Sequence, residues 1–336
     1  MAVPRLVDSF GRKHEYLRIS VTDRCNLRCI YCMPEEGMEF EPSDKILTYD
    51  EISDVVRVVA GMGISKIRLT GGEPLARKEL EKLVDMISHT PGIEDIALTT
   101  NGIFLGPRAA KLKEAGLTRV NISLDSLRPD RFKMITRGGN VQKVLDSIDA
   151  CLKVGLTPIK LNVLLMKGIN DDEIADFISL TKDRDIHVRF IEYMPIGHSD
   201  EQWKNLYLPL STVKEVCTQQ QWDYESVGNV KGNGPAQNYR LKGAVGSFGL
   251  IHPVSEHFCQ SCNRLRLTAD GYIKPCLAWT EQFQVRNVLG DDEALRQMFL
   301  EAIGTKPEHH EMYKFLQDGQ ETTHTPTNRR MSQIGG

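Results

Sequence analysis

The chain has 336 residues, of which 40% are apolar and 26% charged, and its 42 Lys and Arg against 45 Asp and Glu leave a net charge of −3. A composition typical of globular proteins excludes long disorder, and a charge near zero removes the main electrostatic argument for a nucleic-acid or membrane partner. No apolar run approaches the roughly 20 residues of a membrane span. Residues 1–13 carry no apolar secretion signal, so we expect a cytoplasmic protein.

Six strand-like segments alternate with helical patterns over the first two thirds of the chain. The expected strands are 16–22, 66–70, 96–101, 119–125, 158–165 and 187–193. The expected helices are 49–62, 77–90, 107–115, 141–154 and 171–184. Strands that alternate with helices indicate βα units and a parallel sheet, and six units are too few for a closed eight-fold barrel. The sequence therefore predicts an α/β fold, a partial (βα)6 TIM-like barrel.

The glycine-rich stretch 228–235 marks the expected domain boundary. We predict a barrel domain over 8–227 and a smaller C-terminal domain over 228–336, which holds a second group of cysteines and ends in two glycines.

The expected strands alternate apolar with polar side chains, as where Leu17 and Ile19 flank Arg18. Buried parallel strands normally read as continuous apolar runs, and alternation instead puts each set on its own face. Burying many unpaired polar groups would cost a few kcal/mol each. We therefore expect the polar face to line a barrel interior filled by polar ligands and water. An antiparallel sheet with one wet face is the alternative.

Cys25, Cys29 and Cys32 form a C-x3-C-x2-C run just after the first expected strand. Barrel enzymes build their sites at this carboxyl end of the strands. Three thiolates on one short loop can hold three corners of an iron–sulfur cube and leave the fourth iron open. A zinc site, which normally wants a fourth protein ligand, or simple burial remains the alternative from these residues alone.

Cys259, Cys262 and Cys276 form the second group, and Asp270-Gly271 between them predicts a β-hairpin. The hairpin would return Cys276 to the side of Cys262, again with one open corner. Its alternation places Arg264 and Arg266 on one face, where planar guanidinium groups suit phosphate oxygens. The alternative is a zinc knuckle completed by His257. We assign no role to the two lone cysteines, Cys151 and Cys217.

The first cysteine run, with Tyr31 before its last cysteine and Gly71-Gly72-Glu73-Pro74 after the second strand, resembles the radical S-adenosylmethionine (SAM) superfamily. The second group, Cys-x-x-Cys-Asn-Arg-Leu-Arg-Leu-Thr-x-Asp-Gly followed by Cys276, more narrowly resembles the family of GTP 3′,8-cyclases of molybdenum cofactor biosynthesis. The resemblance extends from Leu17 to the terminal Gly335-Gly336.

This resemblance implies a lyase with two [4Fe–4S] clusters, one on each cysteine group, and SAM as co-substrate. SAM bound at the first cluster would be cleaved to a 5′-deoxyadenosyl radical that takes hydrogen from C3′ of GTP, after which C3′ attacks C8 of guanine. The second cluster would hold the guanine. A reducing partner of the flavodoxin or ferredoxin type and a monomer or homodimer are expected. A radical SAM enzyme of peptide maturation and a zinc-stabilised binding module are the alternative functions.

The resemblance also implies roles for individual residues. The expected SAM contacts are Tyr31, Gly72, Glu73, Ser123 and Met194. The expected GTP contacts are Arg18, Arg68, Thr99, Lys160, Arg264, Leu265 and Arg266. Gly335 and Gly336 are expected to enter the site and, together with Arg264 and Arg266, to act in catalysis.

Overall fold

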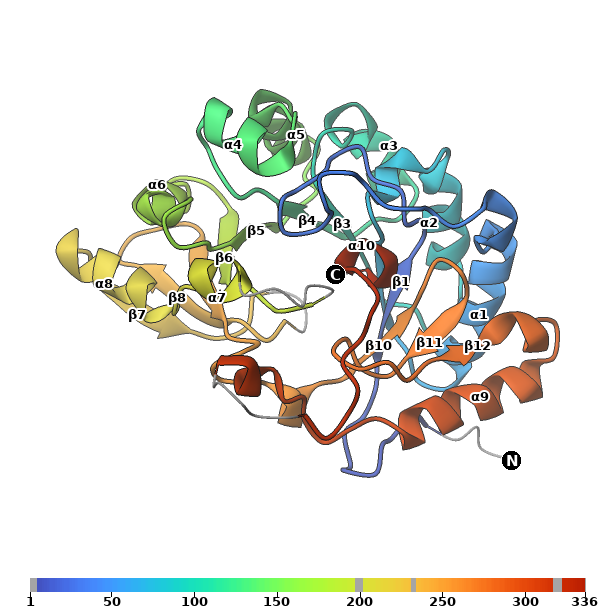
Figure 1. Cartoon of the computed structure of the whole chain (residues 1–336). Helices are drawn as coiled ribbons and strands as arrows, with labels where there is room; N and C mark the ends of the chain where they lie inside the picture. The colour runs from blue at the N-terminus through green and yellow to red at the C-terminus, as the bar shows by residue number, and fades with distance from the viewer. Residues whose placement is uncertain (1–4, 197–201, 231–233, 317–321, 336) are drawn as a thin grey trace.

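The computed structural model describes residues 5–196, 202–230, 234–316 and 322–335, and one curved sheet runs through it (Figure 1). Twelve strands form this sheet in the order β12-β11-β10-β1-β2-β3-β4-β5-β6-β9-β8-β7. The strands are β1 (Tyr16–Ser20), β2 (Lys66–Thr70), β3 (Asp95–Thr100), β4 (Arg119–Ser123), β5 (Ile159–Leu164), β6 (Ile186–Ile191), β7 (Tyr224–Val227), β8 (Gln237–Leu241), β9 (Ser247–Ile251), β10 (Arg264–Leu267), β11 (Tyr272–Lys274) and β12 (Phe283–Gln284).

Strands β1 to β6 are parallel neighbours in chain order, and helices lie on the outer side of their arc (Figure 1). This arrangement confirms the partial (βα)6 barrel. The helices of the chain are α1 (Tyr49–Gly61), α2 (Leu80–Ser88), α3 (Ala109–Glu114), α4 (Pro129–Thr136), α5 (Val141–Lys153), α6 (Ile174–Ser179), α7 (Gln202–Leu206), α8 (Ser211–Gln219), α9 (Asp292–Gly304) and α10 (Met331–Ile334).

Helix starts follow from local capping. Thr48 and Glu51 form a capping box at α1, in which the Thr48 side chain accepts from the Glu51 amide at 3.1 Å and Glu51 accepts from the Thr48 amide at 2.6 Å. Each bond satisfies an amide that the first helical turn leaves open. Helix α4, which Pro129 begins, was not predicted.

The C-terminal region extends both edges of the barrel. Strand β10 pairs with β1 and β9 with β6, both in parallel, and antiparallel strands follow on each side. The predicted hairpin is confirmed in β10 and β11, where Gly271 adopts φ +86°. Strand β7 ends at the predicted domain boundary but pairs with β8 beyond it. The division at 227/228 stays a prediction.

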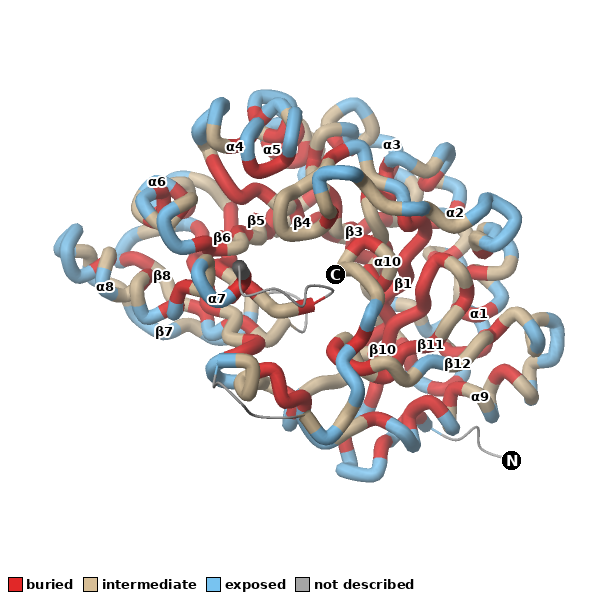
Figure 2. Tube along the Cα trace, viewed as in Figure 1, coloured by how far each residue is buried: buried red, intermediate tan, exposed pale blue. Residues whose placement is uncertain are grey.

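The two faces of the strands differ as the alternation predicts. Leu17 and Ile19 of β1 and Ile67 of β2 are fully buried in the main apolar core, which lies toward the helices. Arg18, between Leu17 and Ile19, and Arg68, next to Ile67, line an internal cavity. Figure 2 shows strands β1 to β6 mostly buried, while the helices expose their outer sides. Among the described helices, none is long and apolar enough to cross a membrane.

Candidate active site

The first cysteine loop follows β1, and all three of its cysteines line the internal cavity. The amide of Cys32 donates to the carbonyl of Cys29 at 2.9 Å, which turns the chain and brings both side chains to one side. Burial, together with the neighbouring Cys25 thiolate, raises the pKa of the Cys32 thiol to about 12. Burial also raises the pKa of Cys25 and Cys29. These raised pKa values mean that the thiols hold their protons when no metal is bound. Cationic iron binds the thiolate form and displaces the protons, so the three cysteines suit an iron–sulfur cluster.

Within the described ranges, no group of three or more His, Cys, Asp and Glu side chains is arranged closely enough to hold a single metal ion.

The glycine segment after β2 packs against the residues that lead into this loop. The amide of Gly72 donates to the carbonyl of Thr22 at 2.8 Å. A Cβ on Gly72 would lie 2.6 Å from the carbonyl oxygen of Asp23, so only glycine fits there. Gly71 adopts φ +146°, a conformation that side chains disfavour. Both glycines line the cavity beside the cysteines, which unites the two predicted motifs.

Glu73 lies behind the cavity lining. Its carboxylate accepts from the Leu75 amide at 2.9 Å, the Thr100 hydroxyl at 2.7 Å and the Asn101 amide at 2.7 Å. The side chain is fully buried, and burial raises its pKa to about 7. Glu73 thus joins the carboxyl ends of β2 and β3, and its predicted contact with SAM stays a prediction.

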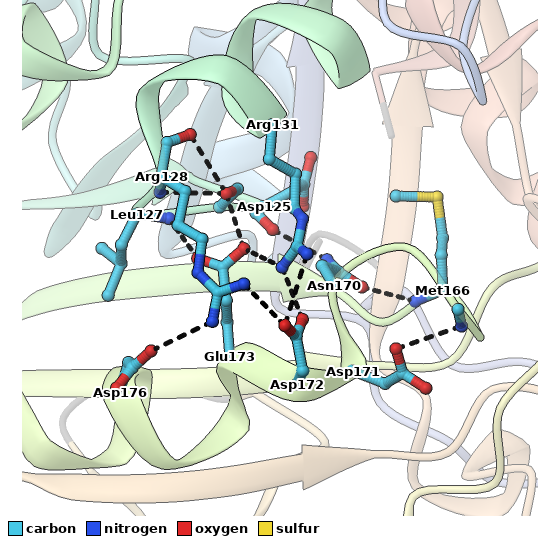
Figure 3. Close-up of polar contacts among 12 residues, drawn as sticks. Asp125, Leu127, Arg128, Arg131, Met166, Asn170, Asp171, Asp172, Glu173 and Asp176 are labelled. Atoms are coloured by element: carbon cyan, nitrogen blue, oxygen red, sulfur yellow. Dashed lines mark hydrogen bonds and ion pairs between the residues drawn. The ribbon is translucent and has the colours of Figure 1, made fainter.

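Asp125 joins the cysteine loop to the ends of β4 and β5. Its carboxylate accepts from the Tyr31 hydroxyl at 2.6 Å and from the Leu164 amide at 2.8 Å. Burial raises the pKa of Asp125 to about 6. The amide group of Asn170 donates to the Asp125 carbonyl at 2.7 Å (Figure 3). The sequence analysis missed Asp125 and Asn170, although Asp125 ends the expected strand 119–125 and lies two residues after the predicted site residue Ser123.

The same network continues through a second buried carboxylate, Glu173, as Figure 3 shows. Glu173 accepts from the Ser126 hydroxyl and the Leu127 amide, both at 2.7 Å, and from Arg131 at 2.7 Å. The segment after β4 is therefore fixed on both sides of Asp125.

A row of arginines forms the floor of the cavity. Strand β10 pairs with β1 so that Arg266 lies opposite Arg18, and β2 pairs with β1 so that Arg68 lies opposite Arg18 on the other side. The parallel register therefore aligns three arginines from three strands. Arg264 is offset by two residues on the same face of β10 and also lines the cavity.

Several buried cations lie close enough together in this floor to lower one another's pKa. Burial and the neighbouring Arg189 lower the pKa of Lys160 to about 6. Burial and Arg264 lower the pKa of Arg266 to about 10. Cations that disfavour each other's charge this strongly point to an anionic ligand.

Arg189 of β6 belongs to this floor and was missed by the sequence analysis. It lines the cavity, lies opposite Asn162 of β5, and burial lowers its pKa to about 9. The sequence does contain a signal for Arg189, because alternation along the expected strand 187–193 puts it on the same face as His187 and Ile191.

Several polar atoms of the cavity have no hydrogen-bond partner among the described residues. They are Arg68 Nε, Thr99 Oγ1, Asn162 Oδ1, Arg189 Nε and Arg264 Nε. Buried polar groups are normally paired. The three arginine Nε groups can only donate, so the site suits a ligand rich in acceptor oxygens.

Most of the other predicted contacts also line the cavity: Tyr31, Gly72, Thr99, Ser123 and Met194. Besides Glu73, two predicted GTP contacts are not part of the lining. Lys160 is fully buried beside the arginines, and the Leu265 side chain packs in the apolar core on the opposite face of β10.

The second cysteine group lies at the edge of the cavity. The amide of Cys262 donates to the carbonyl of Cys259 at 3.0 Å, and Cys276 follows β11. Burial raises the pKa of Cys259 to about 11. For Cys262 burial is outweighed by the cations Lys306 and Arg264, which lower its pKa to about 7. Phe258 and Leu277, each adjacent in sequence to a cysteine, line the cavity.

The C-terminal tail enters the cavity. Arg266 donates through Nη1 to the carbonyl of Gly335 at 2.6 Å and to that of Ile334 at 3.2 Å. Figure 1 shows α10 in the opening enclosed by the sheet. Gly336 lies outside the described residues.

Comparisons with known proteins agree with this geometry. The radical SAM superfamily model matches residues 19–181, and the model described as Molybdenum Cofactor Synthesis C matches residues 186–312. A protein of Listeria monocytogenes serovar 1/2a named GTP 3′,8-cyclase is 59% identical over 98% of this chain and 99% of its own length. A protein of the same name from Lactiplantibacillus plantarum is 50% identical over 99% of both chains.

Among solved structures, Streptococcus suis SuiB bound to S-adenosylmethionine superposes with a TM-score of 0.58 at 13% identity, over 91% of this chain and 68% of that one. At this identity the likeness concerns the fold alone.

Proposed function

The chain belongs to the GTP 3′,8-cyclase family of radical SAM enzymes, and from this premise we propose how its residues carry out the reaction. The enzyme converts GTP and SAM into (8S)-3′,8-cyclo-7,8-dihydroguanosine 5′-triphosphate in molybdenum cofactor biosynthesis. Its iron–sulfur clusters and SAM supply the electron and the radical chemistry that the cyclisation needs.

Cys25, Cys29 and Cys32 would hold the first [4Fe–4S] cluster. Three thiolates leave one iron open for SAM, and Gly72 lets the backbone come close to that ligand. Tyr31, Ser123 and Met194 line the same part of the cavity and would fix the position of SAM. The Asp125 carboxylate would hold Tyr31 in place.

The arginine floor would bind the triphosphate of GTP. Arg18, Arg68, Arg189 and Arg266 come from four strands of one sheet and line one cavity. The unpaired Nε groups of Arg68, Arg189 and Arg264 are the observation that carries this proposal, since a triphosphate supplies acceptor oxygens for such donors and negative charge for the guanidinium groups. A cyclisation that keeps the phosphates intact needs them held, and this floor holds them away from solvent.

Cys259, Cys262 and Cys276 would hold the second [4Fe–4S] cluster, which would bind the guanine. Thr99 and Arg264 line the cavity and would contact the purine or the ribose. Leu265 would contribute only its backbone, because its side chain is in the core.

Gly335 and Gly336 would form the end of the chain that enters the site. Arg266 binds the Gly335 carbonyl, so the tail and the triphosphate would compete for, or share, this guanidinium. The tail would exclude water from the bound reactants and report the presence of GTP to the SAM site.

The cellular compartment, the electron donor, the oligomeric state and the domain division are the remaining parts of the proposal. Two reduced, oxygen-sensitive cysteine groups suit the cytoplasm. The electron donor would be a small flavodoxin or ferredoxin, the enzyme a monomer or homodimer, and the chain two domains, 8–227 and 228–336.

Anaerobic turnover with SAM, dithionite and each nucleoside triphosphate in turn tests the function. We expect 5′-deoxyadenosine and one modified purine with GTP alone, and about eight iron atoms per chain if both clusters are cubes. Equal turnover of ATP and GTP, or a colourless protein that contains zinc, would overturn the proposal.

A further inference from the structure

Two buried cations from outside the second cysteine group hold its backbone. The first is Arg12, in the N-terminal segment. Its Nη1 donates to the carbonyl of Cys259 at 2.9 Å and to that of Glu308 at 2.7 Å, and its Nη2 donates to the carbonyl of Pro307 at 2.7 Å. The side chain is only 7% exposed. Arg12 therefore joins three parts of the chain at the first cysteine of the group.

Asp8 fixes the direction of Arg12. Its carboxylate accepts from Arg12 Nε at 2.5 Å, from the Arg12 amide at 2.9 Å and from the Phe10 amide at 3.0 Å. The remaining edge of the guanidinium is thereby aimed at the three carbonyls. A guanidinium held this way loses little freedom for each bond that it makes.

The second cation is Lys306, which follows α9. Its Nζ donates to the carbonyl of Arg264 at 2.9 Å and to the carbonyl of Pro275 at 2.5 Å. Arg264 lies two residues after Cys262, and Pro275 directly precedes Cys276. Lys306 thus bridges the two strands of the hairpin at the end where its cysteines are.

Arg12 also holds the segment that carries Lys306. Arg12 binds the carbonyls of residues 307 and 308, which directly follow Lys306. Across the described residues, no carboxylate lies within ion-pair distance of Lys306, although it is only 5% exposed. Its charge is therefore free to act on the nearby cysteines.

We propose that Arg12 and Lys306 are positioning residues for the second iron–sulfur cluster, which set the spacing of its three ligands and place positive charge beside it. This inference rests on the proposed role of Cys259, Cys262 and Cys276. Net charge and hydrogen bonding around a cluster set its reduction potential, and groups that orient the ligands typically change metal affinity about 10–100-fold.

The test uses the full chain with Cys25, Cys29 and Cys32 changed to Ala, so that only the second group can bind iron. After anaerobic reconstitution, this parent should hold about four iron atoms. We expect Lys306→Met to lower the midpoint potential of the cluster, measured by electron paramagnetic resonance during redox titration, and Arg12→Met to release iron to a chelator about 10-fold faster. Lys306→Arg and Arg12→Lys should recover part of each effect.

Lys113→Met is the matched control, because Lys113 also donates to a backbone carbonyl, that of Val154, but does so at the end of α5. It should leave both quantities unchanged. If the parent holds no iron, the proposed role of the second group fails, and this inference fails with it. If the parent holds iron and both methionine variants match the control, the positioning role alone is wrong. Circular dichroism on each variant separates loss of iron from loss of fold.

Discussion

The hydroxyl of Tyr31 donates a 2.6 Å hydrogen bond to the buried carboxylate of Asp125. Tyr31 lies between two cysteines of the first loop, and Asp125 lies just beyond β4. This bond connects a loop rich in cysteines to the rigid end of the sheet. Because the Leu164 amide holds the other carboxylate oxygen at 2.8 Å, the loop depends on β4 and β5 together.

Tyr31→Phe should therefore destabilise the protein by about 1–3 kcal/mol, since it leaves a buried carboxylate short of one donor. Urea unfolding of the apoprotein measures this loss. Tyr49→Phe is the control, because the Tyr49 hydroxyl donates to the carbonyl of Lys78 at an exposed site and should cost less than about 1 kcal/mol. Equal losses of unfolding free energy in the two variants would show that the hydrogen bond to Asp125 contributes no more than an exposed one.

GTP binding should take up a proton through Lys160. Burial and Arg189 lower the pKa of this lysine from 10.5 to about 6, so the free enzyme holds it neutral above pH 6. A bound triphosphate stabilises the charged form and raises the pKa again. Affinity for GTP should therefore fall as pH rises above about 6, until the raised pKa of the complex is passed.

Titration calorimetry at pH 8, in two buffers of different ionisation enthalpy, measures this proton uptake. Lys160→Met should abolish the part due to the lysine, whereas Lys111→Met, at an exposed position of α3, should not. Proton uptake by the Lys160 variant equal to that of the natural enzyme would mean that another group titrates.

The site shows which features local sequence reveals. Alternation along β1 and β2 was sufficient to put Arg18 and Arg68 on the inner face, because side-chain direction in a strand has a period of two. The alignment of Arg266 beside Arg18 depends on β10 pairing in parallel with β1, some 250 residues away in the chain, and no local pattern encodes such a pairing. Asp125, Arg12 and Lys306 were missed for the same reason, since each acts on a segment distant in sequence.

Arg189→Gln should raise the KM for GTP about 10–100-fold, because a charged hydrogen bond to a buried phosphate contributes about 1.5–3 kcal/mol. SAM cleavage should continue but lose its coupling to cyclisation, and the ratio of 5′-deoxyadenosine to cyclised product measures that coupling. Arg184→Gln removes an arginine that pairs with Asp149 on the surface and should behave as the natural enzyme. An unchanged KM in the Arg189 variant would remove this residue from the substrate site.

Cys25→Ala should abolish SAM cleavage and reduce the iron content from about eight to about four atoms per chain. The remaining iron would belong to the second group. Cys151→Ala is the matched control: this cysteine is fully buried in α5, so its loss should affect stability alone. Normal cleavage of SAM by the Cys25 variant would show that the first cysteine group has been assigned wrongly.

Gly335→Ala should abolish cyclisation without changing the iron content. Gly335 adopts φ +66°, and a Cβ there would lie 2.5 Å from Cγ2 of Thr70. The left-handed conformation costs a residue with a Cβ about 1–2 kcal/mol, and the clash adds to this, so the tail should leave Arg266. Gly304→Ala is the control, since a Cβ at that position of α9 meets no atom within 4 Å.

Thr70→Ser removes the clashing methyl group, so the double variant should recover part of the activity if the clash dominates and none if the backbone conformation does. Full activity of Gly335→Ala alone would mean that the tail position seen here is not the one used in turnover.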